Sequence, residues 1–216
     1  MGPIPWIIIG VFIFVIGIAV VAIKYSKQQR EKLVRIADNL GMKFNDKGWW
    51  QQPELTGMYR ERELRMKNIY HSTGRSGYYT CRVTMRSESL AAFSSPITIS
   101  HLGRMPGLFT RIGRAFTSRT MTFDHEEFDS KVIVKATDEM EARQIIDMEV
   151  QQDVLNIGRG TTAVKDGTVY FETYGTIQQH EQRIPDILRY LHKMEEKLLR
   201  IKPAYAETDS EYLGSY

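Results

Sequence analysis

An apolar run near the N-terminus constrains this chain more than any other feature. Residues Ile4 to Ile23 read IPWIIIGVFIFVIGIAVVAI and carry no charged side chain. A helix rises about 1.5 Å per residue, so this run would measure roughly 30 Å, the thickness of the hydrocarbon core of a bilayer. Trp6 lies where interfacial aromatic residues gather, and Lys24 follows the other end. We therefore predict a transmembrane anchor over residues 1–25.

A cleaved signal peptide is the alternative interpretation, with Ala22 at the end of a small-residue cleavage site. Signal peptides begin with a positively charged segment, and residues 1–3 carry no charged side chain. The anchor is therefore favoured. Gly10 and Gly17 share one face of the helix, where a partner helix could approach, although no G-x-x-x-G motif is present.

Basic residues after the run predict its orientation. Residues 24–35 contain five basic residues and one acidic residue, Glu31. The basic residues are Lys24, Lys27, Arg30, Lys32 and Arg35. The positive-inside rule places this side in the cytoplasm. We therefore expect a single-pass protein of the inner (plasma) membrane, with the N-terminus outside and the C-terminal domain in the cytoplasm.

Charge and cysteine content exclude some classes of protein. The net charge is only +3, whereas nucleic-acid binders carry a strong basic excess. Cys81 is the only cysteine, so the chain cannot form an internal disulfide, and a single thiol suits a reducing compartment. Its neighbours Thr80 and Arg82 favour a strand, and we interpret Cys81 as a half-buried strand residue.

The first half of the remaining chain predicts one helix and a strand meander. Residues 26–41 form a juxtamembrane helix that Gly41 ends. Its apolar stripe is Leu33, Ile36, Ala37 and Leu40. Short alternating runs separated by polar or glycine-rich breaks then indicate antiparallel strands. These runs are Met42–Asn45, Glu54–Glu61, Glu63–His71, Tyr78–Arg86 and Pro96–Ser100.

The second half predicts helices around a further strand and a hairpin. Lys131–Ala136 is an expected strand, and Asp138 is the expected N-cap of a helix that runs to about residue 157. Its inward positions are Ala142, Ile145, Ile146, Val150 and Val154. Strands 162–164 and 168–173 flank an Asp-Gly turn.

A final helix runs from about residue 185 to 201. Its apolar positions are Ile184, Ile187, Leu191, Met194, Leu198 and Ile201. They fit either a coiled-coil seam or packing on the chain's own sheet, and the short length of the run favours the sheet.

The predicted fold class is therefore α+β: an N-terminal transmembrane helix followed by a cytoplasmic domain of antiparallel strands with covering helices. The expected domains are the anchor (1–25), the juxtamembrane helix (26–41), the cytoplasmic α+β domain (42–202) and a flexible C-terminal tail (203–216).

This plan resembles uncharacterised bacterial single-pass membrane proteins with a cytoplasmic α+β domain, a family of unknown function. The residues that carry the resemblance are Leu40-Gly41-Met42 and the spaced segment Phe123-Asp124, Phe128-Asp129, Val132-Ile133-Val134. The resemblance implies a fold plan and no reaction.

Candidate catalytic and metal-binding residues are few. Asp124, His125, Glu126, Glu127 and Asp129 form the densest group of metal-ligand types, but their spacing fits neither a zinc site nor an EF-hand loop. We interpret this segment as a solvated loop before a strand. The loop from residue 72 to 77 lacks a phosphate-binding motif and is interpreted as a hairpin loop. We predict no catalytic, metal or cofactor residue, and no cofactor.

A basic amphipathic stretch is the most informative predicted surface. No acidic residue occurs between residues 89 and 123. The predicted contact residues are Arg104, Leu108, Phe109, Arg111, Ile112, Arg114, Phe116 and Arg119. Their apolar members could enter a lipid interface while the arginines meet head groups. Packing on the sheet, or on a neighbouring membrane subunit, are the other interpretations.

These features favour a non-catalytic accessory subunit of a multi-subunit inner-membrane complex, which braces neighbouring subunits at the cytoplasmic face. The alternatives are a membrane-surface regulator or anionic-lipid-binding module, and a membrane-tethered enzyme. The expected partners are membrane lipid and other integral membrane subunits, with no nucleic acid and no small-molecule substrate.

Overall fold

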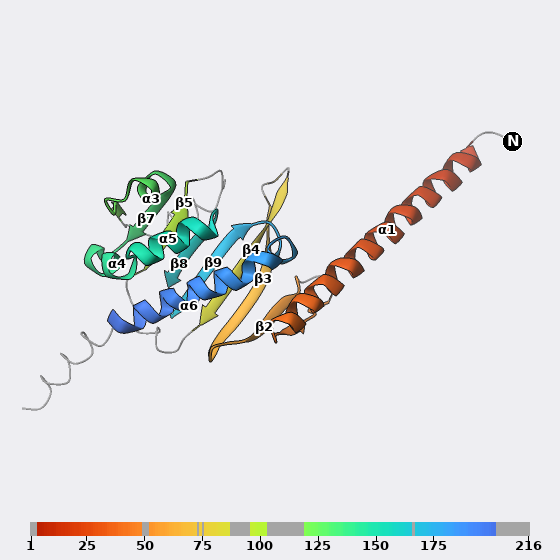
Figure 1. Ribbon diagram of the computed structural model, residues 1–216. Helices are drawn as coiled ribbons and strands as arrows, with labels where there is room; N and C mark the ends of the chain where they lie inside the picture. The colour runs from red at the N-terminus through yellow and green to blue at the C-terminus, as the bar shows by residue number, and fades with distance from the viewer. Residues whose placement is uncertain are drawn as a thin grey trace, which may run out of the picture.

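A nine-stranded antiparallel sheet forms the centre of the described structure (Figure 1). The computed structural model describes residues 4–48, 52–72, 74, 76–86, 96–102, 119–165 and 167–201. The strands are β1 (Lys43–Asn45), β2 (Glu54–Tyr59), β3 (Arg62–Ser72), β4 (Gly77–Arg86), β5 (Ile97–His101), β6 (Arg119–Met121), β7 (Val132–Ala136), β8 (Thr161–Lys165) and β9 (Thr168–Tyr174). Their order in the sheet is β1-β2-β3-β4-β9-β8-β5-β7-β6, and every pairing is antiparallel.

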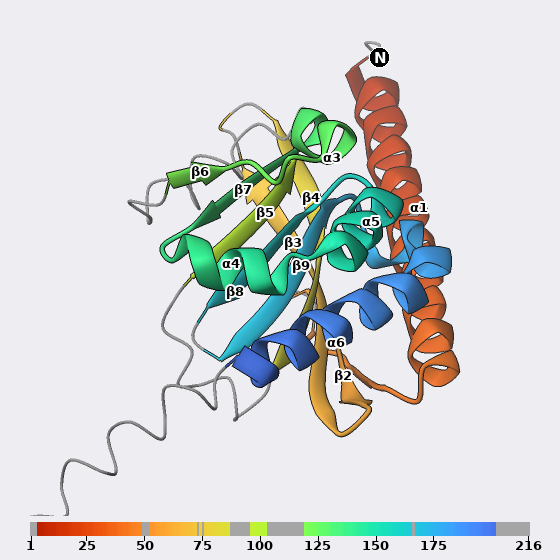
Figure 2. The same ribbon diagram turned by 60° about the vertical axis from the view of Figure 1, so that its left-hand side comes forward.

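Helices cover one face of this sheet (Figure 2). They are α3 (Glu126–Lys131), α4 (Glu139–Ile145), α5 (Met148–Ile157) and α6 (Ile184–Ile201), with short 3-10 turns η2 (Ile177–Gln179) and η3 (Glu181–Arg183) before α6. The long helix α1 (Ile4–Asn39) precedes the sheet. The predicted antiparallel strands and covering helices are thus present.

Alternation along the central strands separates an apolar face from a polar one. In β4 the side chains of Cys81, Val83 and Met85 are buried, and the intervening Arg82 and Thr84 are partly exposed on the other face. The buried set packs beneath α6, as predicted for the last helix. Its buried apolar residues are Ile184, Ile187, Leu188, Leu191, Met194 and Leu198. Cys81 is fully buried rather than half-buried.

The C-terminal half of α1 docks on the sheet through the predicted stripe. Leu33, Ile36 and Ala37 are buried, and α1 contacts β1 and η2. The chain then turns at Gly41, whose φ of +64° lies in the left-handed region that glycine tolerates best. The N-terminal half of α1 projects away from the sheet (Figure 1).

The predicted transmembrane helix is wrong for the part of the chain that the structure describes. No helix there combines the length and the apolar character needed to cross a bilayer. The helix α1 is long, but its second half is charged and docked, and the apolar side chains described in its first half cover Ile13–Ile23, roughly 16 Å of helix. The predicted location as a single-pass inner-membrane protein, with the N-terminus outside and the domain in the cytoplasm, is contradicted by the same finding.

Two local predictions also need correction. The helix expected from Asp138 to residue 157 is two helices, because the chain leaves helical geometry at Ile146 (φ −95°, ψ 60°) and Asp147 caps α5 by accepting from the backbone N–H of Val150. The loop expected before β7 contains the short helix α3. The predicted domain boundaries stay predictions, although α1 runs without a break past residue 25.

Candidate functional site

The projecting part of α1 exposes apolar side chains on all sides. We call Ile13–Ile23 the apolar arm. Its large residues, Ile13, Phe14, Val15, Ile16, Ile18, Val20, Val21 and Ile23, are 48–68% exposed. Successive helical residues are rotated by about 100°, so these positions surround the helix and do not form one stripe. An exposed apolar surface of this extent marks an interaction site.

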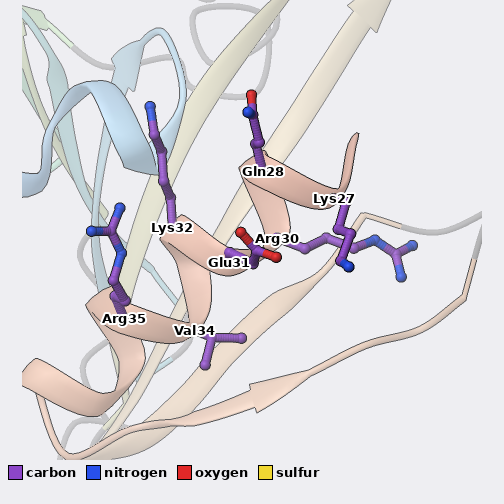
Figure 3. Close-up of a pocket in the computed structure, with 7 residues that line it drawn as sticks. All are labelled: Lys27, Gln28, Arg30, Glu31, Lys32, Val34 and Arg35. Atoms are coloured by element: carbon purple, nitrogen blue, oxygen red, sulfur yellow. The ribbon is translucent and has the colours of Figure 1, made fainter. Parts of the chain in front are cut away.

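Basic residues follow the apolar arm along α1. We call Lys24, Lys27, Arg30, Lys32 and Arg35 the basic band. In Figure 3, Lys27 and Arg30 reach to one side of the helix, and Lys32 and Arg35 to the other. The guanidinium of Arg30 pairs with the carboxylate of Asp46. The hollow drawn there is lined by residues of α1 alone, so it is a shallow surface that cannot enclose a small ligand.

A deeper groove lies between the docked half of α1 and one end of strands β4 and β9. Its volume is about 680 Å³, and it is open to solvent on one side. Its lining includes Tyr25 and Gln29 of α1, Tyr78 and Tyr79 of β4, and residues of the segment that follows β9. This volume lies within the range of roughly 300–1,000 Å³ that ligand sites occupy.

Aromatic side chains gather at this end of the sheet, in one group on each face. The ring of Tyr78 stacks on the ring of His71, with centroids 4.9 Å apart, and on the ring of Tyr174, with centroids 5.5 Å apart. Tyr79 packs against Tyr70 at 5.1 Å. The register places His71 opposite Tyr78, so the β3–β4 hairpin aligns these rings. Among the described residues, the exposed tyrosines are Tyr25, Tyr70, Tyr79 and Tyr174, and all lie at this groove or against a residue that lines it.

A buried carboxylate lies on the same face of the sheet as the stacked rings of His71, Tyr78 and Tyr174. Glu172 is fully buried, and its Oε1 accepts a hydrogen bond from the hydroxyl of Thr80 at 2.6 Å. Its Oε2 accepts two from the guanidinium of Arg82, at 2.8 and 2.5 Å. The Nε2 of His71 lies 3.3 Å from Oε1. Arg82 also lies over the ring of Tyr170, whose pKa is raised by burial. These hydrogen bonds join β4 to β9, the two strands that carry Tyr78 and Tyr174.

The segment after β9 is held by its own hydrogen bonds. The Nε2 of His180 lies 2.8 Å from the carbonyl oxygen of Tyr174, which can only accept, so Nε2 carries the proton. Burial lowers the pKa of His180. Gly175 has a φ of +108°, and a Cβ there would lie 2.5 Å from Oε1 of Gln179. A glycine is therefore required where the chain leaves β9.

Several predicted contact residues lie outside the described part of the chain. They are Arg104, Leu108, Phe109, Arg111, Ile112, Arg114 and Phe116. The backbone of Arg119 begins β6 and pairs with Ala136 of β7. Of the predicted anchor residues, Trp6 and Gly10 lie in α1, and a Cβ at Gly17 would meet no atom within 4 Å. Gly17 and Lys24 thus belong to the apolar arm and the basic band.

The acidic segment before β7 forms the short helix α3 and its N-terminal cap. The carboxylate of Asp129 accepts from the backbone N–H of Phe123 at 3.0 and 3.1 Å and of His125 at 3.3 Å. The Nδ1 of His125 accepts from the N–H of Phe128 at 3.0 Å. No group of three or more possible metal ligands occurs among the described residues. Two of the side chains that suggested a metal site, Asp129 and His125, therefore stabilise the start of α3.

Sequence reasoning missed the groove, because its walls come from distant segments. The tyrosines at residues 70, 78 and 79 lie within predicted strands, where aromatic residues are common, and Tyr174 directly follows one. The Tyr-Tyr pair at the start of β4 was the available signal: alternation exposes one of two adjacent strand residues on each face. Their approach to α1 depends on tertiary packing.

Comparisons with known proteins add one likeness in fold. No family model matches the chain, and no curated protein matches its sequence. A solved structure with a similar fold is the crystal structure of the mycobacterial trehalose monomycolate transport factor A, TtfA. The two chains are 7% identical, the match covers 78% of this chain and 93% of that chain, and the TM-score is 0.53. At this identity the likeness shows a shared fold.

Proposed function

We propose that this protein is a non-catalytic accessory subunit of a membrane-associated protein assembly, held there by the apolar arm. The main support for this proposal is that the apolar arm is exposed on all sides of a helix that projects from the domain (Figure 1). Burying such side chains against an apolar partner is favourable by about 25 cal/mol per Å² of surface removed from water. A partner with an apolar surface, such as an integral membrane protein, is the best match.

The fold and the groove support an accessory role. The protein of similar fold is described as a transport factor for trehalose monomycolate. The described lining of the groove combines tyrosines, amides and two cations, and contains no carboxylate, histidine or cysteine that could serve as a general base or nucleophile. Both observations favour a binding and scaffolding role over an enzymatic one.

Native sizing tests the accessory role. The full chain, extracted from its source cells in a mild detergent, is expected to migrate with partner proteins at a mass well above that of a monomer. An arm variant with Phe14, Ile16, Val20 and Val21 changed to Ser should run as a monomer, because it loses the apolar contact. A full-length chain that runs alone, or an arm variant that keeps its partners, would refute the proposal.

A matched control separates the arm from general surface effects. Met140 and Met148 are 73% and 75% exposed on α4 and α5. Changing both to Ser removes exposed apolar surface from the domain and leaves the arm intact. This variant should migrate with the same partners as the unchanged chain.

Binding to anionic lipid is the second candidate, favoured by the basic band. Each basic residue near an anionic membrane contributes about 1 kcal/mol. Changing Lys27, Lys32 and Arg35 to Gln should therefore lower binding to phosphatidylglycerol vesicles by about a hundredfold. Flotation against phosphatidylcholine vesicles measures the effect. The control changes the exposed residues Lys67, Arg189 and Arg200 to Gln; equal losses in both triple variants would reject a specific role for the band.

A further inference from the structure

One end of the sheet, which we call the tyrosine end, carries the exposed tyrosines of the described chain. Tyr70 and Tyr79 are 53% and 39% exposed on one face, and Tyr174 is 58% exposed on the other. Tyr25 is 62% exposed on α1, just after the apolar arm. Figure 1 and Figure 2 both show the end of β3 and the start of β4 pointing to the same side as the free half of α1. The tyrosine end therefore faces the side on which the apolar arm projects.

The ring of Tyr70 leans toward the hairpin loop. A Cβ at Gly77, at the start of β4, would collide with the ring and hydroxyl of Tyr70, although Tyr70 lies opposite Tyr79 in the register. The ring thus runs along the strand toward its end. On the other face, the ring of Tyr174 stacks on Tyr78 and keeps more than half of its surface exposed. Rings on both faces can therefore reach a surface that lies beyond the end of the sheet.

The opposite end of the sheet has a different surface. It carries the β2–β3 turn, the end of β4 and the β8–β9 turn. Its exposed side chains include Arg60, Glu61, Arg86 and Lys165, and no exposed tyrosine occurs there among the described residues. The two ends thus differ in the kind of surface that they would meet.

Cationic side chains accompany the tyrosine end. Lys24 and Lys27 flank Tyr25 in sequence and are exposed, and the described lining of the groove holds Arg30 and Lys32 and no carboxylate. The acidic helix α3 contacts β7, four strands away from β4 in the sheet. Tyrosine rings gather where a membrane surface is apolar on one side and wet on the other, and basic residues favour anionic lipids. This combination matches the head-group layer of an anionic bilayer.

We propose that the tyrosine end lies against the head-group layer of an anionic bilayer, with Tyr25, Tyr70, Tyr79 and Tyr174 in contact with it. The inference rests on the proposed membrane association and adds an orientation to it. The β2–β3 turn and the end of β4 lie on the far side of the domain from the lipid.

Site-specific fluorescence measures this orientation on the full chain. Cys81 is the only cysteine and is buried, so a cysteine introduced at the surface is the reactive thiol. Tyr70→Cys and Tyr174→Cys, one for each face, are labelled with the polarity-sensitive dye NBD. Each is mixed with phosphatidylcholine vesicles that contain or lack phosphatidylglycerol. A blue shift with higher emission is expected at both positions on the anionic vesicles.

Labels at the opposite end are the matched control. Arg86 at the end of β4 and Met140 on α4 are exposed. Arg86→Cys and Met140→Cys, labelled in the same way, should keep the emission that they have without vesicles. Equal shifts at all four positions would show adsorption without orientation and would overturn the proposal.

Paired substitutions measure what the rings contribute to binding. Tyr79→Ala with Tyr174→Ala should weaken flotation on anionic vesicles by about tenfold, because two ring surfaces stay in water. Tyr79→Phe with Tyr174→Phe keeps both rings and should bind within about threefold of the unchanged chain. Should the alanine pair fail to fold by circular dichroism, Tyr25→Ser on the exposed part of α1 replaces it and is also expected to weaken binding.

The orientation and the accessory role fail in different experiments. An unchanged chain that does not float on anionic vesicles, or that floats without a shift at Tyr70→Cys and Tyr174→Cys, overturns the orientation. So does a shift that occurs only when partner proteins are present, because it assigns the tyrosine end to a protein contact. None of these results alters native sizing, which alone tests whether the apolar arm holds the chain in an assembly.

Discussion

The guanidinium of Arg82 on β4 donates two hydrogen bonds to one carboxylate oxygen of Glu172 on β9, and that carboxylate is fully buried. Removing the arginine leaves a buried carboxylate with the Thr80 hydroxyl as a donor and the Nε2 of His71 at 3.3 Å, and without the guanidinium that offsets its charge. Arg82→Ala is therefore expected to lower the free energy of unfolding by about 3 kcal/mol. Urea denaturation measures it.

The neighbouring strand provides the control for this pair. Lys67 lies opposite Arg82 in the β3–β4 register and is exposed. Lys67→Ala should change the free energy of unfolding by less than about 0.5 kcal/mol. Equal effects of the two substitutions would show that the buried pair contributes nothing specific.

The break between α4 and α5 depends on a capping side chain. Asp147 accepts from the N–H of Val150 at 3.0 Å, and its carboxylate pairs with Lys197 of α6. Asp147→Ala should lower the free energy of unfolding by about 1 kcal/mol, and Asp147→Asn by less, because asparagine also caps. Glu149→Ala, at an exposed position of the same helix, is the comparison. An Asp147→Ala variant as stable as Glu149→Ala would contradict the capping role.

The buried His180 and the partly buried His101 predict a loss of stability in mild acid. Burial lowers the pKa of His101 and of His180. The unfolded chain then takes up protons at higher pH than the folded one, so their contribution is complete above a pH of about 6.5 and declines as the pH falls through that value toward the lower folded pKa. Thermal melts at pH of about 7.5 and 5.5 should show a smaller decrease in Tm for the His101→Gln, His180→Gln variant than for the unchanged chain. An identical decrease would refute this assignment.

The thiol of Cys81 should be inert in the folded chain. Burial raises its pKa to about 12, and its side chain has no exposed surface. Only the thiolate reacts quickly with alkylating reagents. Mass spectrometry should therefore detect alkylation by iodoacetamide at pH 8 in urea and none in buffer over the same interval. Modification at comparable rates in both conditions would show that β4 opens readily.

Local patterns predicted most of the elements, and contacts between distant residues account for what they missed. The alternation of Cys81, Val83 and Met85 identifies β4 and its inward face, and the stripe of Leu33, Ile36 and Ala37 identifies the docked part of α1. The break at Ile146 was missed because the apolar spacing continues across it: Ile145 and Ile146 are both buried. The short strand β6 was missed because three residues carry too little periodicity.

The site was harder to predict than the fold. The walls of the groove are separated by up to about 150 residues, as in the hydrogen bond from Gln178 to the carbonyl oxygen of Gln29. The predicted contact stretch from Arg104 to Phe116 lies outside the described residues and stays a prediction. The predicted anchor lies in α1, and its membrane-spanning role is contradicted for the described residues.

The continuity of α1 has a mechanical consequence. Its 36 residues form one helix that carries the apolar arm, the basic band and Tyr25 in a single rod of roughly 54 Å. The C-terminal half of this helix is held to the domain by buried Leu33 and Ile36 and by the hydrogen bond from Gln178 to Gln29. A sideways force on the free end is therefore transmitted first to β1 and η2, which the docked half of α1 contacts.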